Sequence, residues 1–164
     1  SAASDVYKRQ VKRRVDLISE EFGLVEYLET NPYRLGFSIR KTVGMASIIA
    51  MEPDVIVLDE PTTGQDYLGI KAIRLAIKKL KDQGKTVIVV SHDMPLVAED
   101  TDRVLVMCDT ELIFDGTPSK LFSDKSTLEK TNLLPPQITS FTQKIGISKE
   151  TESLLSVEEA AKTL

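Results

Sequence analysis

The sequence is poor in cysteine, since Cys108 is the only one among 164 residues. A single cysteine excludes an internal disulfide and a cysteine-rich metal site, and it fits a reducing compartment. Long apolar runs are also lacking, because none approaches the roughly 18 residues that a membrane-spanning helix needs. No signal-peptide pattern is recognisable either. We therefore expect a chain that has no membrane span of its own.

Positive charge is in deficit. Lysine and arginine number 21 against 25 aspartates and glutamates, which gives a formal net charge of -4. This balance argues against a nucleic-acid-binding surface. The basic run at residues 7–14, YKRQVKRR, is the local exception, and a solvated helix face explains it better than a nucleic-acid contact. The sequence therefore predicts no nucleic-acid partner.

The composition itself is that of a folded chain. With 41% hydrophobic and 28% charged residues, the sequence can bury the core of about one domain. The first residue is not methionine, and residues 1–10 show no amphipathic period. We expect residues 1–10 to be non-native or disordered, and the sequence to come from a truncated reading frame.

Hydrophobic periodicity predicts alternating helices and strands. Helical spacing covers residues 11–28, 38–50 and 67–83, whereas short apolar runs at 55–58, 86–90 and 103–107 are typical of strands, the last leading into a hairpin at 112–116. Such continuous apolar strands are expected to be buried on both faces. The order of strand, helix, strand, short helix and strand predicts an α/β fold with a parallel sheet flanked by helices.

Local signals predict where several helices begin or end. Gly84 follows the helix at 67–83 as its C′ residue. The run LLPPQITSFTQKIG has proline at its start and glycine at its end, which predicts a helix in a C-terminal helical tail. Ser156 and Glu159 fit the capping box of a final short helix.

Two adjacent carboxylates, Asp59 and Glu60, follow the apolar run at residues 55–58. Ligands of open α/β sheets bind outside the carboxyl ends of the strands. Mg²⁺ suits two carboxylates there, because it takes one or two of them, keeps several waters and shares phosphate oxygens. The pattern resembles a Walker B strand. The alternative, that these carboxylates only cap the next turn, stays open, since such strings are short.

His92 is the only histidine, and it also follows a predicted buried strand. A lone histidine is most often a surface or structurally satisfied residue. His92, however, lies one strand–helix–strand unit after Glu60. If the two strands are neighbours, both side chains open onto the same edge of the sheet, where a histidine can hydrogen-bond a γ-phosphate.

Together these motifs resemble the second half of an ABC-type ATPase. The stretches AMEPDVIVLDEPTTGQD, SHD, DRVLVM and DGTP stand in that family's order over about residues 11–145. The strings NPYRL, AMEP and LLPPQI carry a finer resemblance to the ATPases of energy-coupling-factor importers for vitamins, cobalt or nickel. The resemblance implies a partial P-loop NTPase fold, with the ATPase portion at residues 11–122 and a helical extension at 123–164.

The resemblance also implies roles for individual residues. Asp59 would hold Mg²⁺, mainly through water, and Glu60 would act as the general base on the attacking water. His92 would contact the γ-phosphate. Asp66 would be the D-loop aspartate that reaches the second ATPase subunit. For Asp66 an N-cap of the helix beginning at Tyr67 is the alternative, and both can hold.

One family motif is absent from the sequence. A phosphate-binding P-loop needs GxxxxGKS/T, and the nearest string begins at Gly64 and puts Ile70 where the lysine must stand. The Walker A half and the Q-loop are therefore missing. We expect this polypeptide alone to bind ATP poorly or not at all.

A second motif is degraded. ABC ATPases place LSGGQ at a helix start, where it grips the γ-phosphate of the ATP held by the opposite subunit. The gapless alignment puts Leu35, Gly36, Phe37, Ser38 and Ile39 there, so only the leucine matches. An ordinary helix start is the alternative for this segment. The damaged motif predicts a partner with an intact signature, in a heterodimer or a tandem polypeptide.

Three functions are compatible with these motifs. The first is an ATP-hydrolysing subunit, using ATP and Mg²⁺, that energises an importer through a transmembrane partner at the cytoplasmic face of the membrane. The second is a non-hydrolysing regulatory half of an asymmetric dimer. The third, a DNA-repair ATPase, would need long heptad arms and a basic face, and the sequence has neither. The transported substrate is not readable, because the ATPase does not touch it.

Overall fold

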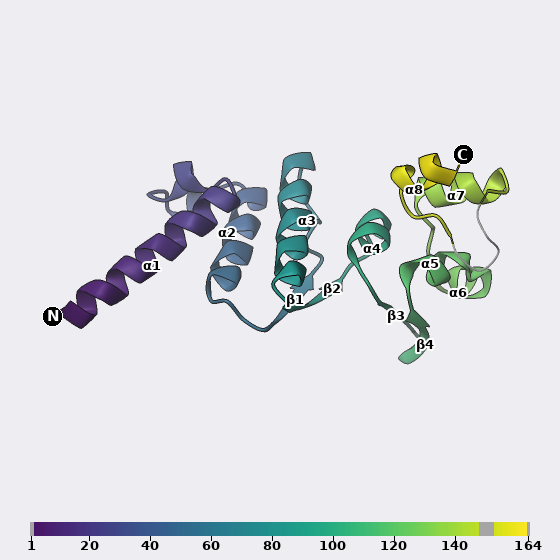
Figure 1. Cartoon of the computed structure of the whole chain (residues 1–164), viewed down its shortest axis with the longest axis horizontal. Helices are drawn as coiled ribbons and strands as arrows, with labels where there is room; N and C mark the ends of the chain where they lie inside the picture. Colours follow the sequence, from purple (N-terminus) through teal and green to yellow (C-terminus); the bar gives the residue numbers. More distant parts are fainter. Residues whose placement is uncertain (1, 148–152, 164) are drawn as a thin grey trace. The chain divides into compact units, whose positions relative to one another are not determined.

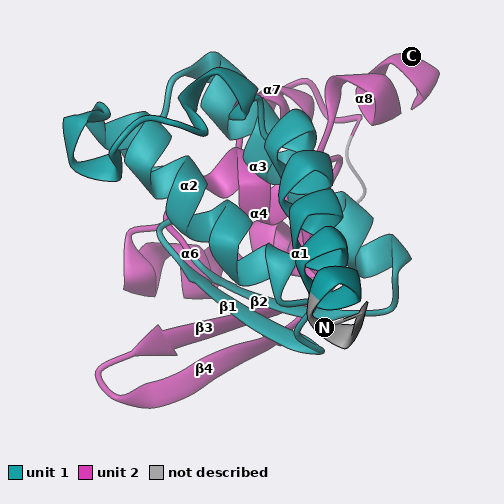
Figure 2. Ribbon diagram, turned by 90° about the vertical axis from the view of Figure 1, so that its left-hand side faces the viewer, with its two compact units in different colours: residues 1–90 teal, residues 91–164 magenta. Residues whose placement is uncertain are grey.

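The computed structural model describes residues 2–147 and 153–163 (Figure 1). The chain divides into two compact units, residues 1–90 and residues 91–164, coloured separately in Figure 2. Within the described residues no helix is both long and apolar enough to span a membrane. The domain limits predicted at residues 10 and 122 stay predictions.

The first unit carries the predicted strand–helix–strand arrangement. Its elements are α1 (Ala2–Glu21), η1 (Val25–Tyr27), η2 (Pro32–Arg34), α2 (Phe37–Ala50), β1 (Val55–Asp59), α3 (Tyr67–Asp82) and β2 (Thr86–Val90). Strands β1 and β2 pair in parallel, with Val55 opposite Thr86 and Asp59 opposite Val90. Their carboxyl ends therefore lie side by side, which is the condition that the sequence argument for the site required.

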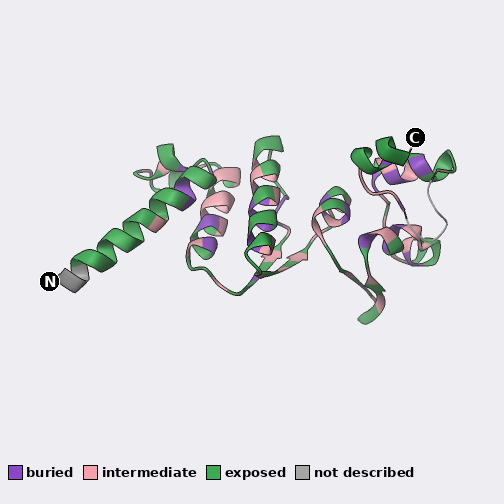
Figure 3. Cartoon of the chain, viewed as in Figure 1, coloured by how far each residue is buried: buried purple, intermediate pink, exposed green. Residues whose placement is uncertain are grey.

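Helix α1 begins at Ala2 and so includes residues that lack an amphipathic period. Residues 5–13 are all exposed, and only the end of α1 enters the core, through Ile18 (Figure 3). Val11 and Val15, two apolar residues of the helical spacing at residues 11–28, are exposed as well. The apolar spacing of residues 11–15 therefore does not mark a buried face, because the helix extends past the layer that it packs against.

The core of the first unit lies on one face of the two-stranded sheet. It joins residues of α1, α2, α3 and β1: Ile18, Phe22, Leu24, Ala46, Ile49, Ile56, Ala76 and Leu80. Ile56 is 2% exposed, but its neighbours Val55 and Val57 are 56% and 63% exposed. The prediction of burial on both faces was therefore wrong for β1. Successive side chains of a strand point to opposite faces, and the helices of this unit cover only one of them.

The ends of the first unit's elements follow the predicted chemistry. Gly84 has φ of +75°, and the N–H of Lys85 donates to the Leu80 carbonyl at 3.0 Å, which closes a Schellman motif after α3. Lys85 then pairs with Asp54 at 2.7 Å, joining the starts of β2 and β1. The hydrogen bond and charge of Lys85 lower the pKa of the Asp54 carboxyl.

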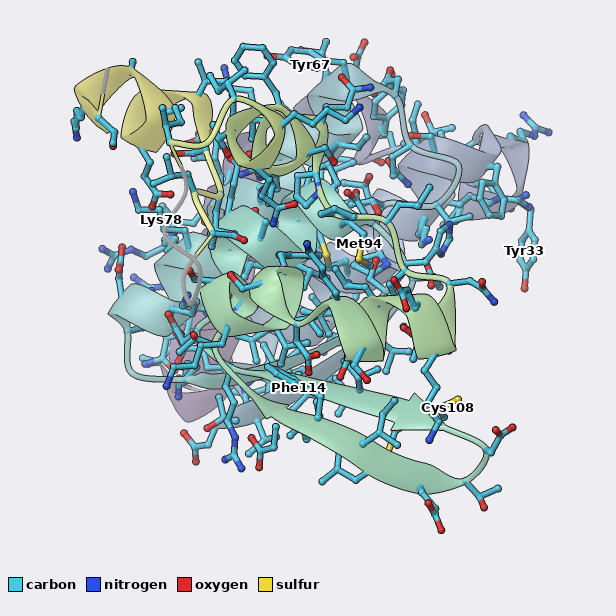
Figure 4. All side chains as sticks on the ribbon, turned by 90° about the vertical axis from the view of Figure 1, so that its right-hand side faces the viewer. Tyr33, Tyr67, Lys78, Met94, Cys108 and Phe114 are labelled. Atoms are coloured by element: carbon cyan, nitrogen blue, oxygen red, sulfur yellow. The ribbon has the colours of Figure 1, made fainter. Side chains whose placement is uncertain are left out.

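The second unit contains a hairpin and short helices. Its elements are α4 (Met94–Asp100), β3 (Val104–Cys108), β4 (Glu111–Gly116), α5 (Pro118–Ser123), α6 (Lys125–Thr131), α7 (Gln137–Lys144) and α8 (Val157–Thr163). The predicted antiparallel hairpin is confirmed, and β3 and β4 form a sheet of their own. Cys108, labelled in Figure 4, is the last residue of β3. Within β3, Leu105 and Met107 are exposed. The prediction of burial on both faces was therefore wrong for β3 as well.

Helix starts in the tail agree with the sequence signals. Pro136 is the N-cap of α7, and Gly146 follows that helix with φ of +76°. Before α8, the N–H of Glu159 donates to Ser156 Oγ at 3.1 Å. The Glu159 carboxylate accepts from the N–H of Leu155 at 2.7 Å, one residue earlier than a standard capping box requires. The predicted cap is confirmed with that shift.

Candidate functional site

The two adjacent carboxylates stand where β1 ends. Asp59 is the last residue of β1 and is exposed, while Glu60 is half-buried. Glu60 has φ of +46°, a left-handed conformation that is uncommon for a residue with a side chain. Its N–H donates to the Val90 carbonyl at 2.8 Å, so the ladder to β2 continues one residue beyond the strand. Backbone strain of this kind clusters at functional sites.

The residues after Glu60 form a closed turn, which we call the 60–65 turn. Thr63 Oγ1 donates to Glu60 Oε2 at 3.0 Å, and the N–H of Thr63 donates to the Glu60 carbonyl at 3.3 Å. The N–H of Gln65 donates to the Thr62 carbonyl at 3.1 Å. The Glu60 carboxylate thus accepts a hydrogen bond inside its own turn. The alternative interpretation, a carboxylate that caps the next turn, therefore holds in part and does not exclude a chemical role.

The start of α2 contacts the 60–65 turn. Ser38 Oγ donates to Gln65 Oε1 at 2.7 Å, and Gln65 Nε2 donates back to the Ser38 carbonyl at 3.3 Å. Lys41 Nζ donates to the carbonyls of Glu60 and Thr63, the latter at 3.0 Å. The structure therefore brings the degraded signature and the carboxylate pair together within one unit.

The signature segment adopts the geometry of a helix start. Gly36 is the N-cap of α2 and makes no side-chain capping bond, because it has no side chain. Phe37 is the first helical residue and is 59% exposed, whereas Leu35, Ser38 and Ile39 are half-buried. The ordinary helix start is thus confirmed as a description of the backbone. Contact of residues 35–39 with a partner's nucleotide stays a prediction.

Asp66 follows the 60–65 turn and caps α3. Its Oδ1 accepts from the N–H of Gly69 at 2.8 Å, and α3 begins at Tyr67 as predicted. The N-cap interpretation is confirmed. A D-loop contact with a second subunit stays a prediction that this cap does not exclude, since Asp66 is exposed.

His92 lies in the second unit, in the short segment before α4. The N–H of Asp93 donates to Ser91 Oγ at 3.0 Å, and Asp93 Oδ1 accepts from the N–H of Leu96 at 3.2 Å, which caps α4. His92 itself is exposed between them. The parallel pairing of β1 and β2 meets the condition on which its role rests. Its position relative to Glu60 stays a prediction.

The described residues fit Mg²⁺ only as part of a larger site. Among residues 2–147 and 153–163 no group of three or more His, Cys, Asp or Glu could hold a metal ion. Mg²⁺ is usually bound by one or two carboxylates together with waters and substrate phosphates. The exposed Asp59 carboxylate fits one such position, directly or through water.

A phosphate loop is not formed by the segment that begins at Gly64. Its residues from Tyr67 onward are the first turns of α3, so Gly69 and Ile70 are helical. A cavity of about 300 Å³ borders Asp59 and Lys41, but α2 and β1 line it mostly with apolar side chains such as Met45, Ile48 and Ile56. This lining does not suit a triphosphate.

Comparison with known proteins shows which proteins the chain is similar to. No family model matches the chain. The energy-coupling factor transporter ATP-binding protein EcfA2 of Mycoplasmopsis synoviae is 42% identical over 120 residues, which are 73% of this chain and 39% of that protein. The corresponding EcfA1 of Caldanaerobacter subterraneus subsp. tengcongensis is 38% identical over 154 residues, or 92% of this chain and 55% of that protein.

A solved structure is similar as well. That of cbiO1 from Clostridium perfringens, part of the ABC transporter complex cbiONQ, matches with a TM-score of 0.62. Its sequence is 30% identical, and the match covers 85% of this chain and 55% of that chain. The chain therefore has part of the α/β fold of an ABC ATPase.

The class and the finer resemblance are both confirmed. The chain is a homologue of the ATP-binding proteins of ABC transporters. Within that class, it resembles the ATPases of energy-coupling-factor transporters. It spans about half the length of these relatives or less.

Proposed function

We propose that this chain is the C-terminal part of an ATP-hydrolysing subunit that energises a membrane importer of the energy-coupling-factor type. One observation supports this most directly. Asp59 and Glu60 stand at the carboxyl end of β1, next to the carboxyl end of β2. Glu60 has a left-handed backbone conformation there, and its N–H donates a hydrogen bond to the Val90 carbonyl. The relatives named as transporter ATP-binding proteins support the same assignment.

Each candidate site residue has its own role in the proposed ATP hydrolysis. Mg²⁺ bound with ATP supplies charge neutralisation at the β- and γ-phosphates. The Asp59 carboxylate would hold that ion, mainly through water. The Glu60 carboxylate takes a proton from the attacking water, and the hydroxyl of Thr63 keeps Oε2 oriented for it. The His92 imidazole donates a hydrogen bond to a γ-phosphate oxygen.

In our proposal Asp59 and Glu60 make up only part of the nucleotide site. The described residues offer no phosphate loop, and the segment that begins at Gly64 is helical where such a loop would need free N–H groups. In our proposal the Walker A half belongs to sequence outside this chain, so the chain alone binds ATP poorly. Millimolar Mg-ATP then gives it no thermal shift, since a ligand stabilises only what it binds.

The partners follow from the signature segment. Gly36 offers no hydroxyl, and Phe37 stands where a glycine would permit close approach to a phosphate. We therefore propose a second ATPase subunit or tandem half that carries an intact signature. The complex named for the cbiO1 neighbour suggests a transmembrane subunit as the other partner, with the ATPase peripheral at the cytoplasmic face.

A second candidate function has one observation in its favour. The same signature segment lacks the serine and glycines that grip a partner's γ-phosphate, which suits a regulatory half that binds nucleotide without hydrolysing it. Glu60 and His92 argue against it, because a non-hydrolysing half needs neither.

Substitution of Glu60 by glutamine in the complete protein distinguishes the two functions. Glu60→Gln should retain ATP binding and lower the hydrolysis rate by about 100-fold or more, the scale of losing a positioned base. Steady-state ATPase assays with a nucleotide-binding control measure both effects. Glu20→Gln, at an exposed position of α1, is the matched control and should hydrolyse ATP like the wild type. Turnover of Glu60→Gln near the wild-type rate would support the regulatory half.

A further inference from the structure

Contacts that no sequence motif requires join the start of α2 to the 60–65 turn. We call this set the α2 latch. On α2 it comprises Phe37, Ser38 and Lys41, and on the turn it comprises Glu60, Thr63, Gly64 and Gln65. All of these residues belong to the first unit. Residues of α2 and of the turn are 19 to 27 positions apart along the chain, so the latch is a tertiary feature.

Lys41 is the polar centre of the latch. Its side chain is half-buried, and Nζ donates to the main-chain oxygens of both Glu60 and Thr63. A single ammonium group that bridges two carbonyls of one turn fixes the peptide planes on both sides of it. Glu60 needs such support, because its φ of +46° is unfavourable for a residue with a side chain.

Ser38 and Gln65 form the second contact of the latch. Their two hydrogen bonds, at 2.7 and 3.3 Å, are reciprocal, since each residue both donates and accepts. Ser38 stands where the family signature has glycine. Gln65 stands in the string PTTGQD, where the commoner family string PTAGLD has leucine. The two departures from the family pattern are therefore in contact.

Phe37 adds an apolar contact to the latch. A Cβ added to Gly64 would lie 2.7 Å from Phe37 Cε1, so the ring occupies the space that this glycine leaves open. Gly64 also has φ of +74°, which a residue with a side chain rarely adopts. The third departure, phenylalanine for glycine at position 37, thus also serves the contact with the turn.

We propose that Lys41 is a positioning residue for Glu60, and that the α2 latch makes the 60–65 turn follow the start of α2. This inference rests on the proposed function, in which Glu60 is the base. Residues 35–39 occupy the place of the signature that faces the partner's nucleotide. A displacement of this segment is then transmitted through Lys41 to the peptide of Glu60, and through Gln65 to the segment that leads into Asp66.

The test compares three lysine variants of the complete, assembled ATPase. Lys41→Met removes both bonds to the turn, Lys41→Arg can restore them, and Lys78→Met is the control at an exposed position of α3 (Figure 4). We expect Lys41→Met to lower kcat by about 10- to 100-fold, because a displacement near 1 Å at a reacting group has effects on this scale. KM for ATP should change by less than about twofold, since Lys41 is not proposed to touch nucleotide. Lys41→Arg should recover most of kcat.

Hydrogen exchange on the same preparations gives a readout that does not depend on ATP. In Lys41→Met the amides of Glu60, Thr63 and Gln65 should exchange faster, while those within α3 and all amides of Lys78→Met should match the wild type. A merely stabilising lysine would instead accelerate exchange across the whole unit. If Lys41→Met precipitates, Lys41→Gln replaces it, with the same results expected.

The outcomes separate this inference from the function on which it rests. Wild-type kcat, or unchanged exchange at the 60–65 turn, in Lys41→Met would overturn the positioning role even if Glu60→Gln abolishes hydrolysis. A fully active Glu60→Gln would overturn the proposed function. The exchange result would then still report whether Lys41 fixes the turn.

Discussion

The two units of the chain use the same kinds of polar residue in opposite ways. In the first unit, Ser38, Lys41, Thr63 and Gln65 gather at one turn where a carboxylate ends a strand, and none of them is fully buried. In the second unit, Thr139 and Thr142 are 0% exposed, and their hydroxyls donate to the carbonyls of Leu154 and Thr139, at 2.7 and 3.1 Å.

The two sets of polar groups differ in how accessible they are to a ligand. A buried hydroxyl that already bonds a main-chain carbonyl completes an internal hydrogen-bond network and stabilises the fold. A half-buried group at the end of a parallel strand retains access to solvent and to a bound molecule. The polar residues at the start of α2 and in the 60–65 turn therefore indicate chemistry, whereas the buried threonines of α7 indicate architecture. Substitutions in the two units should accordingly change different measurable quantities.

The largest expected effect is a loss of ATPase activity at the candidate site of the first unit. We have proposed a second ATPase subunit or tandem half. If the two are arranged head to tail, the site around Asp59 and Glu60 would receive the partner's signature, and residues 35–39 would complete the partner's site. Losing one transition-state donor typically costs about 2.7–4 kcal/mol, or about 10²–10³ in rate. We therefore expect unequal sites, with Glu60→Gln abolishing most of the ATPase activity of the assembled transporter. The matching glutamine substitution in the partner should have the smaller effect.

The two variants are compared in steady-state ATPase assays on the assembled transporter. Equal losses in the two variants, or a fully active homodimer of the complete protein, would contradict the asymmetric arrangement. Either result would mean that Gly36 and Ser38 replace the family residues adequately.

A smaller effect tests the second unit's buried hydroxyls. Thr139→Val keeps the shape of the side chain but leaves the Leu154 carbonyl without its partner at 2.7 Å, which should destabilise the chain by about 1–3 kcal/mol. Chemical denaturation measures the loss. Thr86→Val, at an exposed position of β2, is the matched control and should change stability by less than about 0.5 kcal/mol. Equal stability of the two variants would remove the distinction between the units.

Local chemistry made much of the fold predictable. Gly84, Asp66 and the hairpin after β3 were predicted from residue types that leave few alternatives to the backbone. The burial of β1 was predicted wrongly, because a continuous apolar run does not reveal whether both covering layers belong to the same chain. Val57 is therefore exposed despite an apolar sequence around it.

The site was predictable only in part, for a similar reason. Asp59 and Glu60 stand out because charges directly after a continuous apolar run are unusual. The contacts of Lys41 and Gln65 were missed, since they depend on how α2 lies against a turn about 20 residues away in sequence. The signal was present in the sequence, because Phe37, Ser38 and Gln65 all depart from the family pattern. Only the structure brings these departures into contact.

The smallest predicted effect is the pH dependence of a cap in the second unit. Asp124 is the N-cap of α6, and its carboxylate accepts from the hydroxyl of Thr127 at 2.6 Å and from the N–H of Thr127 at 3.2 Å. The hydroxyl bond first, and then the backbone bond, lower the pKa of this carboxyl below its ordinary value. A carboxyl whose pKa is lower in the folded state stabilises fully above its unfolded value of about 3.9. The stabilisation is lost as the pH falls through the folded pKa.

Asp124→Ala should therefore cost about 1 kcal/mol at pH 7, the usual loss for an N-cap. The difference from the wild type should shrink in denaturation experiments near pH 3. Asp124→Asn is the matched control, because asparagine caps nearly as well without a titrating group. Its stability should lie near that of the wild type at pH 7 and should fall less on acidification. A difference between Asp124→Ala and the wild type that is the same at both pH values would mean that the charge of Asp124 contributes nothing. The cap would then act only through its hydrogen bonds to Thr127.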